Sequence, residues 1–148
     1  MAKRRLLLNE NQLKANTDSV YTDISSSLTL TDSLGGATYS IGTKDAFFLE
    51  FAGQKWLHVN LSGINSSGTP SGTLIVGTGG LITSIQDFKI SYCSKFSGSN
   101  ATDADQVYPK FVTSSPFNIV FERKTSNLAL PAPTFSNGRI TFSINIFI

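Results

Sequence analysis

The residues with the greatest chemical reactivity in this chain are its single histidine, His58, and its single cysteine, Cys93. A nucleophile needs a base within hydrogen-bond reach, and His58 could act only if the fold brought a Ser or an Asp beside it. No nucleophile-elbow glycine pattern marks such a residue. Cys93 is expected to be a buried or half-buried packing residue in a strand. We therefore predict no catalytic residues and a protein that is not an enzyme.

A metal or cofactor site is not predicted either. Zinc needs three or four His, Cys or carboxylate ligands, and the ten acids of this chain are dispersed. Asp103 and Asp105 could offer oxygen ligands to Ca²⁺, but their segment lacks the glycine and the final glutamate of a dedicated calcium loop. The glycines of residues 77–80 lack the Gly-Lys-Ser/Thr of a phosphate-binding loop and predict a hairpin turn.

Trp56 and His58 are the candidate residues for binding a ligand or a second subunit. Within residues 55–61, the leucines and Val59 alternate with Trp56, His58 and an asparagine. A strand would place the two rings on the face opposite the apolar one. A surface tryptophan can serve as a subunit contact or as a platform for a sugar-type ligand, because its ring buries a large area at low entropic cost. Trp56 could equally lie in the core of a sandwich covered on both faces.

The clearest periodic segment is the one from residue 140 to residue 148. Its isoleucines and Phe142 recur at every second position, whereas the alternate positions hold hydrophilic residues and Phe147. Period-two alternation predicts a strand with one buried face. Phe147, the one aromatic residue on the hydrophilic face, is our candidate for a contact with a neighbouring copy.

Composition favours an all-β domain. Charged residues make up 15% of the chain, which holds 20 Ser, 15 Thr and 10 Asn. These polar residues are poor helix formers, because their side chains compete for backbone hydrogen bonds, and they suit strand faces and turns. The expected strands recur at intervals of roughly 8–12 residues, as in a sandwich or barrel. We predict a single jelly-roll-like β-sandwich of about eight strands over residues 20–148.

Glycine- and proline-rich segments separate the expected strands. The strands are predicted at residues 20–30 (one strand or two short ones), 38–41, 46–52, 55–61, 73–76, 81–93, 107–113, 117–123 and 140–148. Tight turns are predicted at Gly53-Gln54 and Asn137-Gly138, and polar loops at 62–72 and 94–106. Pro109 predicts an edge strand. An extended cover segment is predicted at residues 128–135.

Residues 1–19 are predicted to form a basic arm. Lys3, Arg4 and Arg5 could contact phosphates or an acidic patch on a neighbouring protein, or could merely solvate a flexible terminus. The net charge of +2 is too small for a nucleic-acid-binding domain, so nucleic-acid contact is not expected beyond weak contact by the arm. The leucines after Arg5 are too few for a signal peptide, and no segment reaches the ~18 apolar residues of a membrane span. We expect synthesis as a soluble cytoplasmic product without membrane contact.

As a whole the chain resembles small structural proteins of bacteriophage and virus particles, of the capsid-decoration, head-fibre, tail-accessory and jelly-roll coat types. The resemblance is carried by the basic start, the Ser/Thr/Asn-rich strands of 20–33, the phenylalanine-rich segments 47–51 and 117–121, and the terminal apolar strand. It implies a virion component, made in the host cytoplasm, that forms a trimer or ring and docks on larger virion proteins. The arm is shorter and less basic than that of a packaging coat protein, so an accessory role is expected.

A second resemblance covers seven residues. The segment Lys55-Trp-Leu-His-Val-Asn-Leu61 is similar to the Trp-Leu-x-Val-Asp-Leu strand of discoidin-type carbohydrate-binding sandwiches, except that Asn60 stands where that strand has Asp. It implies a carbohydrate- or receptor-binding module as the alternative function, with Trp56 in contact with a glycan.

Overall fold

The computed structural model describes residues 19–51, 53–82, 88–100, 107–112 and 117–147, and for residues 19, 88–90 and 147 it describes the backbone alone. These residues form antiparallel strands and one short 3-10 turn, η1 (Ser25–Ser27). The strands are β1 (Ser19–Asp23), β2 (Thr29–Asp32), β3 (Ala37–Phe51), β4 (Gln54–Gly68), β5 (Leu74–Gly77), β6 (Phe88–Ser99), β7 (Val107–Phe111), β8 (Ile119–Arg123) and β9 (Phe135–Phe147).

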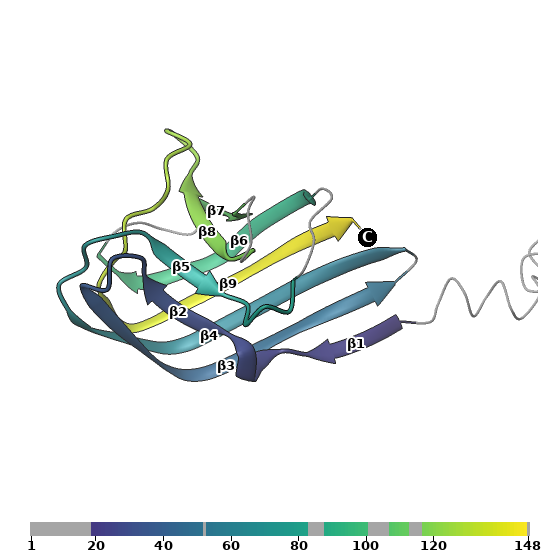
Figure 1. Ribbon diagram of the computed structural model, residues 1–148, viewed down its shortest axis with the longest axis horizontal. Coiled ribbons are helices and arrows are strands. Elements are labelled where there is room, and N and C mark those ends of the chain that lie inside the picture. Colours follow the sequence, from purple (N-terminus) through teal and green to yellow (C-terminus); the bar gives the residue numbers. More distant parts are fainter. Residues whose placement is uncertain (1–18, 52, 83–87, 101–106, 113–116, 148) are drawn as a thin grey trace, which may run out of the picture.

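The strands follow one another in space in the order β6-β9-β4-β3-β2-β5-β8-β7, and β1 pairs with β3 outside this path. The long strands β3, β4, β9 and β6 run side by side, while β5, β8 and β7 lie over one side of them (Figure 1). Strand β2 pairs with both β3 and β5 and so joins the two layers. Because β6 and β7 are also in contact, the sheet is nearly closed. The predicted all-β fold is confirmed.

The core fills the space between the two layers. In β4 and β9 the fully buried side chains stand at alternate positions, among them Leu57 and Val59 in β4 and Ile144 in β9. The ring of Phe121 in β8 packs edge-on against Phe142 in β9, with ring centroids 5.4 Å apart. The alternation that predicted one buried face in residues 55–61 and 140–148 is therefore confirmed.

Strands β3 and β4 form a hairpin that is longer than predicted. Strand β4 continues through residues 62–68, which were predicted to be a loop, and β3 is continuous where two strands were predicted. The reason is Ile64, which is fully buried and pairs with Ile41 across the hairpin. Gly63 adopts a φ of +63°, which glycine allows at little cost, so the chain passes an irregular point without leaving the sheet.

The tight turn of this hairpin lies one residue earlier than predicted. Phe51 pairs with Gln54, so Gln54 belongs to the ladder of β4 and not to the turn, as Gly53-Gln54 would require. Gly53 has a φ of +76°, the conformation that a two-residue hairpin loop demands of glycine. The sequence identified the turn, but the pairing of the flanking residues decided its position.

Asn137-Gly138 is not the predicted turn, because β9 passes through it. Asn137 has a φ of +48° at an irregular point of the ladder. There the backbone of Gly138 approaches Gly98 in β6 so closely that a Cβ on Gly98 would lie 2.6 Å from the Gly138 Cα. Within the described residues strand β6 runs from Phe88 to Ser99, across the start of the predicted 94–106 loop, since β9 offers it a partner over that length.

Three further expectations can be compared with the structure. Residues 20–30, predicted to form one strand or two short ones, form two, β1 and β2, with η1 between them. Pro109 lies in β7, which ends the strand order, so its predicted edge position is confirmed. The cover segment at 128–135 makes isolated bridges to its neighbours and buries Leu130, as predicted for an extended segment packed on the core.

A buried carboxylate holds the turns at one end of the fold together. Asp32, at the end of β2, is 5% exposed. Its oxygens accept hydrogen bonds from the amides of Gly72 at 2.7 Å, Ser71 at 2.8 Å, Ala37 at 3.0 Å and Leu34 at 3.2 Å. Burial by itself would raise the pKa of this carboxyl, but the amide hydrogen bonds together hold the pKa below its ordinary value of 3.8.

The lowered pKa of Asp32 predicts a dependence of stability on acid. A group whose pKa is depressed by folding contributes stability above its unfolded pKa, and this stability is lost as pH falls through the folded pKa. Urea unfolding at pH 7 and below pH 3.8 should show Asp32→Asn destabilised at pH 7, with a smaller loss on acidification than wild type. Asp45→Asn, at an exposed aspartate, is the control and should behave as wild type. An Asp32→Asn chain as stable as wild type at pH 7 would contradict the role.

Candidate binding face

The register of β4 places Trp56 and His58 on the outer side of the long layer. Both rings are half-buried, while Leu57 and Val59, which alternate with them, are fully buried on the core side. The predicted separation of these two faces is confirmed. Trp56 stands between Leu49 in β3 and Asn145 in β9, and its ring is therefore not part of the core between the layers.

Aromatic side chains from several strands gather around this pair. Directly paired residues of antiparallel strands project on the same side of a sheet and contact one another, and diagonal neighbours lie within reach of large rings. The Tyr21 ring of β1 lies 5.0 Å from Phe47 in β3, and Phe47 lies 5.2 Å from His58. We name these residues and their outer-side neighbours the aromatic face; its members are Tyr21, Phe47, Leu49, Trp56, His58 and Tyr92.

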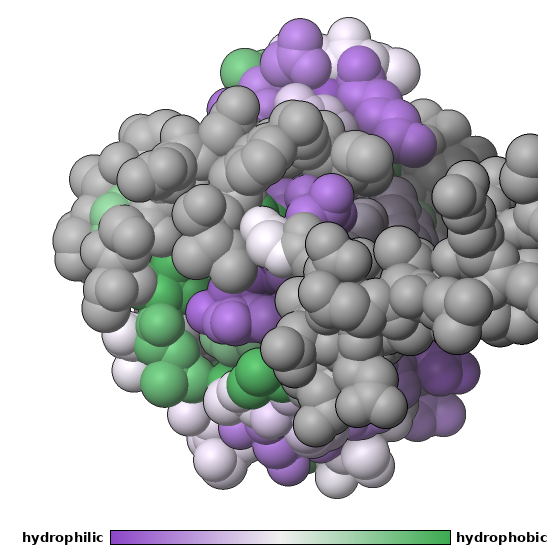
Figure 2. Space-filling model, turned by 90° about the vertical axis from the view of Figure 1, so that its right-hand side faces the viewer, coloured by the Kyte–Doolittle hydropathy of each residue, from purple (hydrophilic) through white to green (hydrophobic). Residues whose placement is uncertain are grey.

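The aromatic face is half-buried at its centre and exposed at its ends. Tyr21 in β1 is 60% exposed and Tyr92 in β6 is 51% exposed. Next to it, Phe51 adds further apolar surface. Hydrophobic and hydrophilic side chains both reach the surface at the end of the molecule where β1 and the β3–β4 hairpin lie (Figure 2). This face is therefore the candidate contact surface of the described residues.

His58 does meet a serine, as catalysis would require. Its Nδ1 lies 3.0 Å from the Oγ of Ser143, which is opposite His58 in the β4–β9 ladder and only 6% exposed. In the described part of the chain, no carboxylate forms a hydrogen bond with His58, so the orienting acid of a catalytic triad is missing there. The pair acts as a cross-strand hydrogen bond between β4 and β9.

Beyond the aromatic face, the same side of the layer becomes polar. The Asn60 Oδ1 accepts hydrogen bonds from the Thr141 Oγ1 at 2.9 Å and from the Arg139 Nε at 3.2 Å. Next to Trp56, the Nδ2 of the buried Asn145 donates to the Gln54 Oε1 at 3.0 Å. These polar side chains are satisfied within the sheet, and they border the aromatic face with neutral groups and one arginine.

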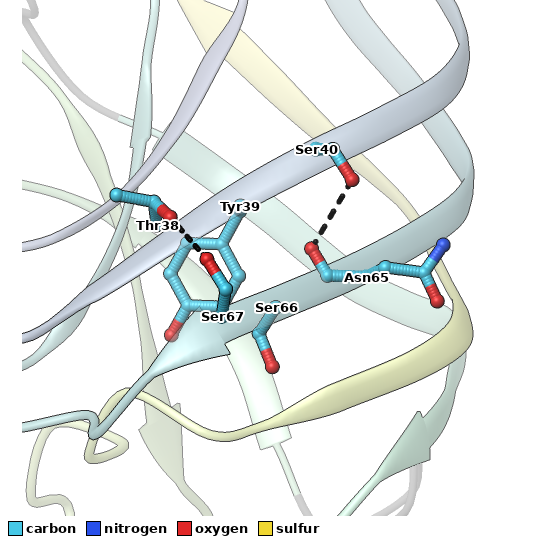
Figure 3. Close-up of a pocket in the computed structure, with 6 residues that line it drawn as sticks. All are labelled: Thr38, Tyr39, Ser40, Asn65, Ser66 and Ser67. Atoms are coloured by element: carbon cyan, nitrogen blue, oxygen red, sulfur yellow. Dashed lines mark hydrogen bonds between the residues drawn. The ribbon is translucent and has the colours of Figure 1, made fainter.

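A second site to consider is a hollow of 340 Å³ near the far end of the β3–β4 hairpin (Figure 3). It is lined by Thr38, Tyr39, Ser40, Asn65, Ser66 and Ser67. Much of its hydrogen-bonding capacity is used within the protein: Thr38 bonds to Ser67 at 2.7 Å, and the Tyr39 hydroxyl donates to the Pro133 carbonyl at 2.8 Å. Burial, aided by the charge of Asp32, raises the pKa of Tyr39 to about 12, so its hydroxyl stays protonated. The hollow is therefore lined mainly by polar side chains that form hydrogen bonds within the protein.

The remaining predicted residues are placed as follows. Lys3, Arg4 and Arg5, with the rest of the predicted arm up to residue 18, lie outside the described residues. Phe147 pairs with Gln54 in the β4–β9 ladder, but its side chain also lies outside the described part, so its predicted contact stays a prediction. Tyr21, Phe47 and Tyr92 were not predicted as site residues, because only the pairing of β1, β3 and β6 with their neighbours brings them to one face.

The described residues offer little other chemistry. No group of three or more His, Cys, Asp or Glu side chains gathers there in a way that could hold a metal ion. Over the same ranges no helix has the length and hydropathy of a membrane span. Comparison with protein-family models, with curated proteins and with solved structures finds no match to this chain.

The thiol of Cys93 generates a prediction about reactivity. Burial raises the pKa of this half-buried thiol to about 11, from an ordinary value of 9.0. At pH 8 the folded protein should therefore hold roughly a hundredfold less thiolate than the unfolded chain, and thiolate is the reactive form. Mass spectrometry of iodoacetamide labelling should show a rate about a hundredfold lower in buffer than in denaturing urea. Equal rates would show that Cys93 is an accessible, activated thiol.

Proposed function

We propose that this protein is a non-enzymatic structural component of a virus or phage particle that acts through self-assembly and through docking on larger particle proteins. The observation that carries the proposal is the aromatic face, whose exposed ends Tyr21 and Tyr92 lie on strands β1 and β6 at either side of the long layer. Large rings presented by a rigid sheet are the side chains that contribute most to binding between subunits.

The construction of the domain supports an assembly role. Among the described residues, every buried side-chain nitrogen or oxygen has a hydrogen-bond partner, so the sheet is a rigid body that presents the aromatic face in one geometry. The viral context comes from the resemblance of the whole sequence to virion proteins. Symmetric copies that bury such a face would form a closed oligomer, which we propose to be a trimer or ring.

Self-assembly is the first property to test. We expect the full chain to sediment as an oligomer at micromolar concentration in analytical ultracentrifugation. Tyr92→Ser should weaken this association at least tenfold if the aromatic face is the contact. Leu128→Ser, at a residue that is 68% exposed and lies outside the aromatic face, is the control. A chain that stays monomeric throughout the micromolar range would contradict the proposed function.

A carbohydrate- or receptor-binding role is the alternative, and the position of Trp56 favours it. Its half-buried ring lies beside the buried Asn145, which bonds to the exposed Gln54 side chain, so a ring face and the Gln54 amide are within reach of one another. Sugars bind to this combination because their C–H groups pack on the ring while their hydroxyls bond to polar groups.

A glycan array followed by titration calorimetry separates this alternative from assembly. If the alternative is correct, the protein should bind a glycan saturably, and Trp56→Ala should weaken the binding by about tenfold or more, equivalent to roughly 1.4 kcal/mol per decade. Tyr39→Phe, in the hollow between β3 and β4, should leave the affinity unchanged. No bound glycan would exclude the carbohydrate-binding form of the alternative, and a loss confined to Tyr39→Phe would place the site in the hollow instead.

A further inference from the structure

We propose that strand β1 pairs antiparallel with the β1 of a second copy, about a two-fold axis that passes beside Tyr21. This inference rests on the self-assembly proposed above and names one of its contacts. A two-fold contact joins copies in pairs, so a trimer or ring would use a second contact as well, such as one at Tyr92. Strand β1 lies beside β3, and within the described residues it has no strand on its other side. Among the described residues its outer edge is thus an unpaired row of backbone donors and acceptors, which is a template for another strand.

The ladder shows which backbone groups of β1 point away from β3. In an antiparallel pair, residues alternate between those that bond to the partner strand and those whose amide and carbonyl point outward. The Ile24 amide donates to the Ala46 carbonyl at 2.9 Å, so it points toward β3. By alternation, Val20 and Thr22 also bond to β3. The amides and carbonyls of Ser19, Tyr21 and Asp23 therefore point outward.

These outward residues are self-complementary. They are spaced symmetrically about Tyr21, so a two-fold axis there pairs Tyr21 with Tyr21 of the second copy and Ser19 with Asp23 of the second copy. Since each such pair exchanges two N–H···O bonds, the contact would contain about six backbone hydrogen bonds. This register follows from the two-fold axis alone, so the pairing needs no shift of the strand and no β-bulge.

The charges of β1 agree with the same register. Its one charged residue, Asp23, would face the neutral Ser19 of the second copy rather than another carboxylate. Like charges opposite each other would oppose pairing. The Asp23 Oδ1 already accepts hydrogen bonds from the Ser25 Oγ at 2.6 Å and the Ser25 amide at 2.9 Å, so its charge is turned toward its own chain.

The side chains of β1 also fit a second copy. The Tyr21 ring, 60% exposed, already packs on Phe47, and the two-fold axis would set it beside Tyr21 of the second copy. The row from His58 through Phe47 to Tyr21 would then continue across the dimer. Protected edges carry prolines or lysines. Strand β7, at one end of the strand order, carries both in Pro109 and Lys110, whereas β1 carries neither.

Hydrogen exchange of single amides tests the geometry directly. By NMR, the Tyr21 amide should exchange at least tenfold more slowly at a concentration where the full chain is dimeric than at one where it is monomeric. The Thr22 amide, which points to β3, should be protected at both concentrations and serves as the internal control. A Tyr21 amide whose exchange does not change between the two states would overturn the proposal.

Charge substitutions at the axis give an independent test. Tyr21→Lys and Tyr21→Glu should each weaken self-association at least tenfold in analytical ultracentrifugation, because each places like charges opposite each other. An equimolar mixture of the two should associate again. The same pair of substitutions at Leu34, which is 74% exposed and outside β1, should leave association unchanged.

The two proposals fail in different ways. If wild type associates but the Tyr21 variants associate equally well, or their mixture gains nothing, the β1 pairing is wrong and self-assembly uses another surface. If wild type is monomeric at every concentration, self-assembly itself is wrong and the pairing falls with it. Protection of the Thr22 amide in both Tyr21 variants shows that β1 is still folded, so a loss of association reports on the edge.

Discussion

The packing of the Phe121 ring against Phe96 and Phe142 is the contact on which the two layers depend. Phe121 comes from β8, in the shorter layer, whereas the other two come from β6 and β9 in the longer one, and both pairs of ring centroids lie 5.4 Å apart with the rings nearly perpendicular. Edge-to-face pairs of this kind add to the free energy gained by burying each ring. Because Phe142 must point inward to make this contact, it decides which residues of β9 face the core and which face outward. A slip by one residue would turn Phe142 outward and Ser143 into the core.

The set of side chains on the outer side of the sheet follows from this orientation of β9. Once alternate residues of β4 and β9 are committed to the core, Trp56, His58 and Ser143 have only the other side of the sheet available. Neighbouring strands then bring Phe47 and Tyr21 beside them at ring distances of 5.0–5.2 Å. The inner and outer faces are therefore consequences of one register. The aromatic face cannot be displaced without disrupting the core.

Period-two alternation was a good predictor of which side each residue occupies and a poor predictor of where strands begin and end. Residues 62–68 contain two glycines and three serines, which favour loops, yet they extend β4 because Ile64 is buried and β3 provides a partner. Asn137-Gly138 has the composition of a hairpin turn, yet the close approach of Gly98 makes it an irregular point within β9. In both places a neighbouring strand, distant in sequence, overrode the local preference for a turn.

The sequence by itself determined the all-β class, the buried faces of 55–61 and 140–148, and the position of Trp56 and His58 opposite the apolar residues. Those properties depend on composition and on a period of two, which are local to each segment. Only the tertiary structure decided that His58 meets Ser143, 85 residues away, that Tyr21 joins Phe47, and that β1 forms an edge. Such contacts depend on which strands are neighbours. Alternation within one strand carries no information about its partner, because any strand with one apolar face can pack on the same core.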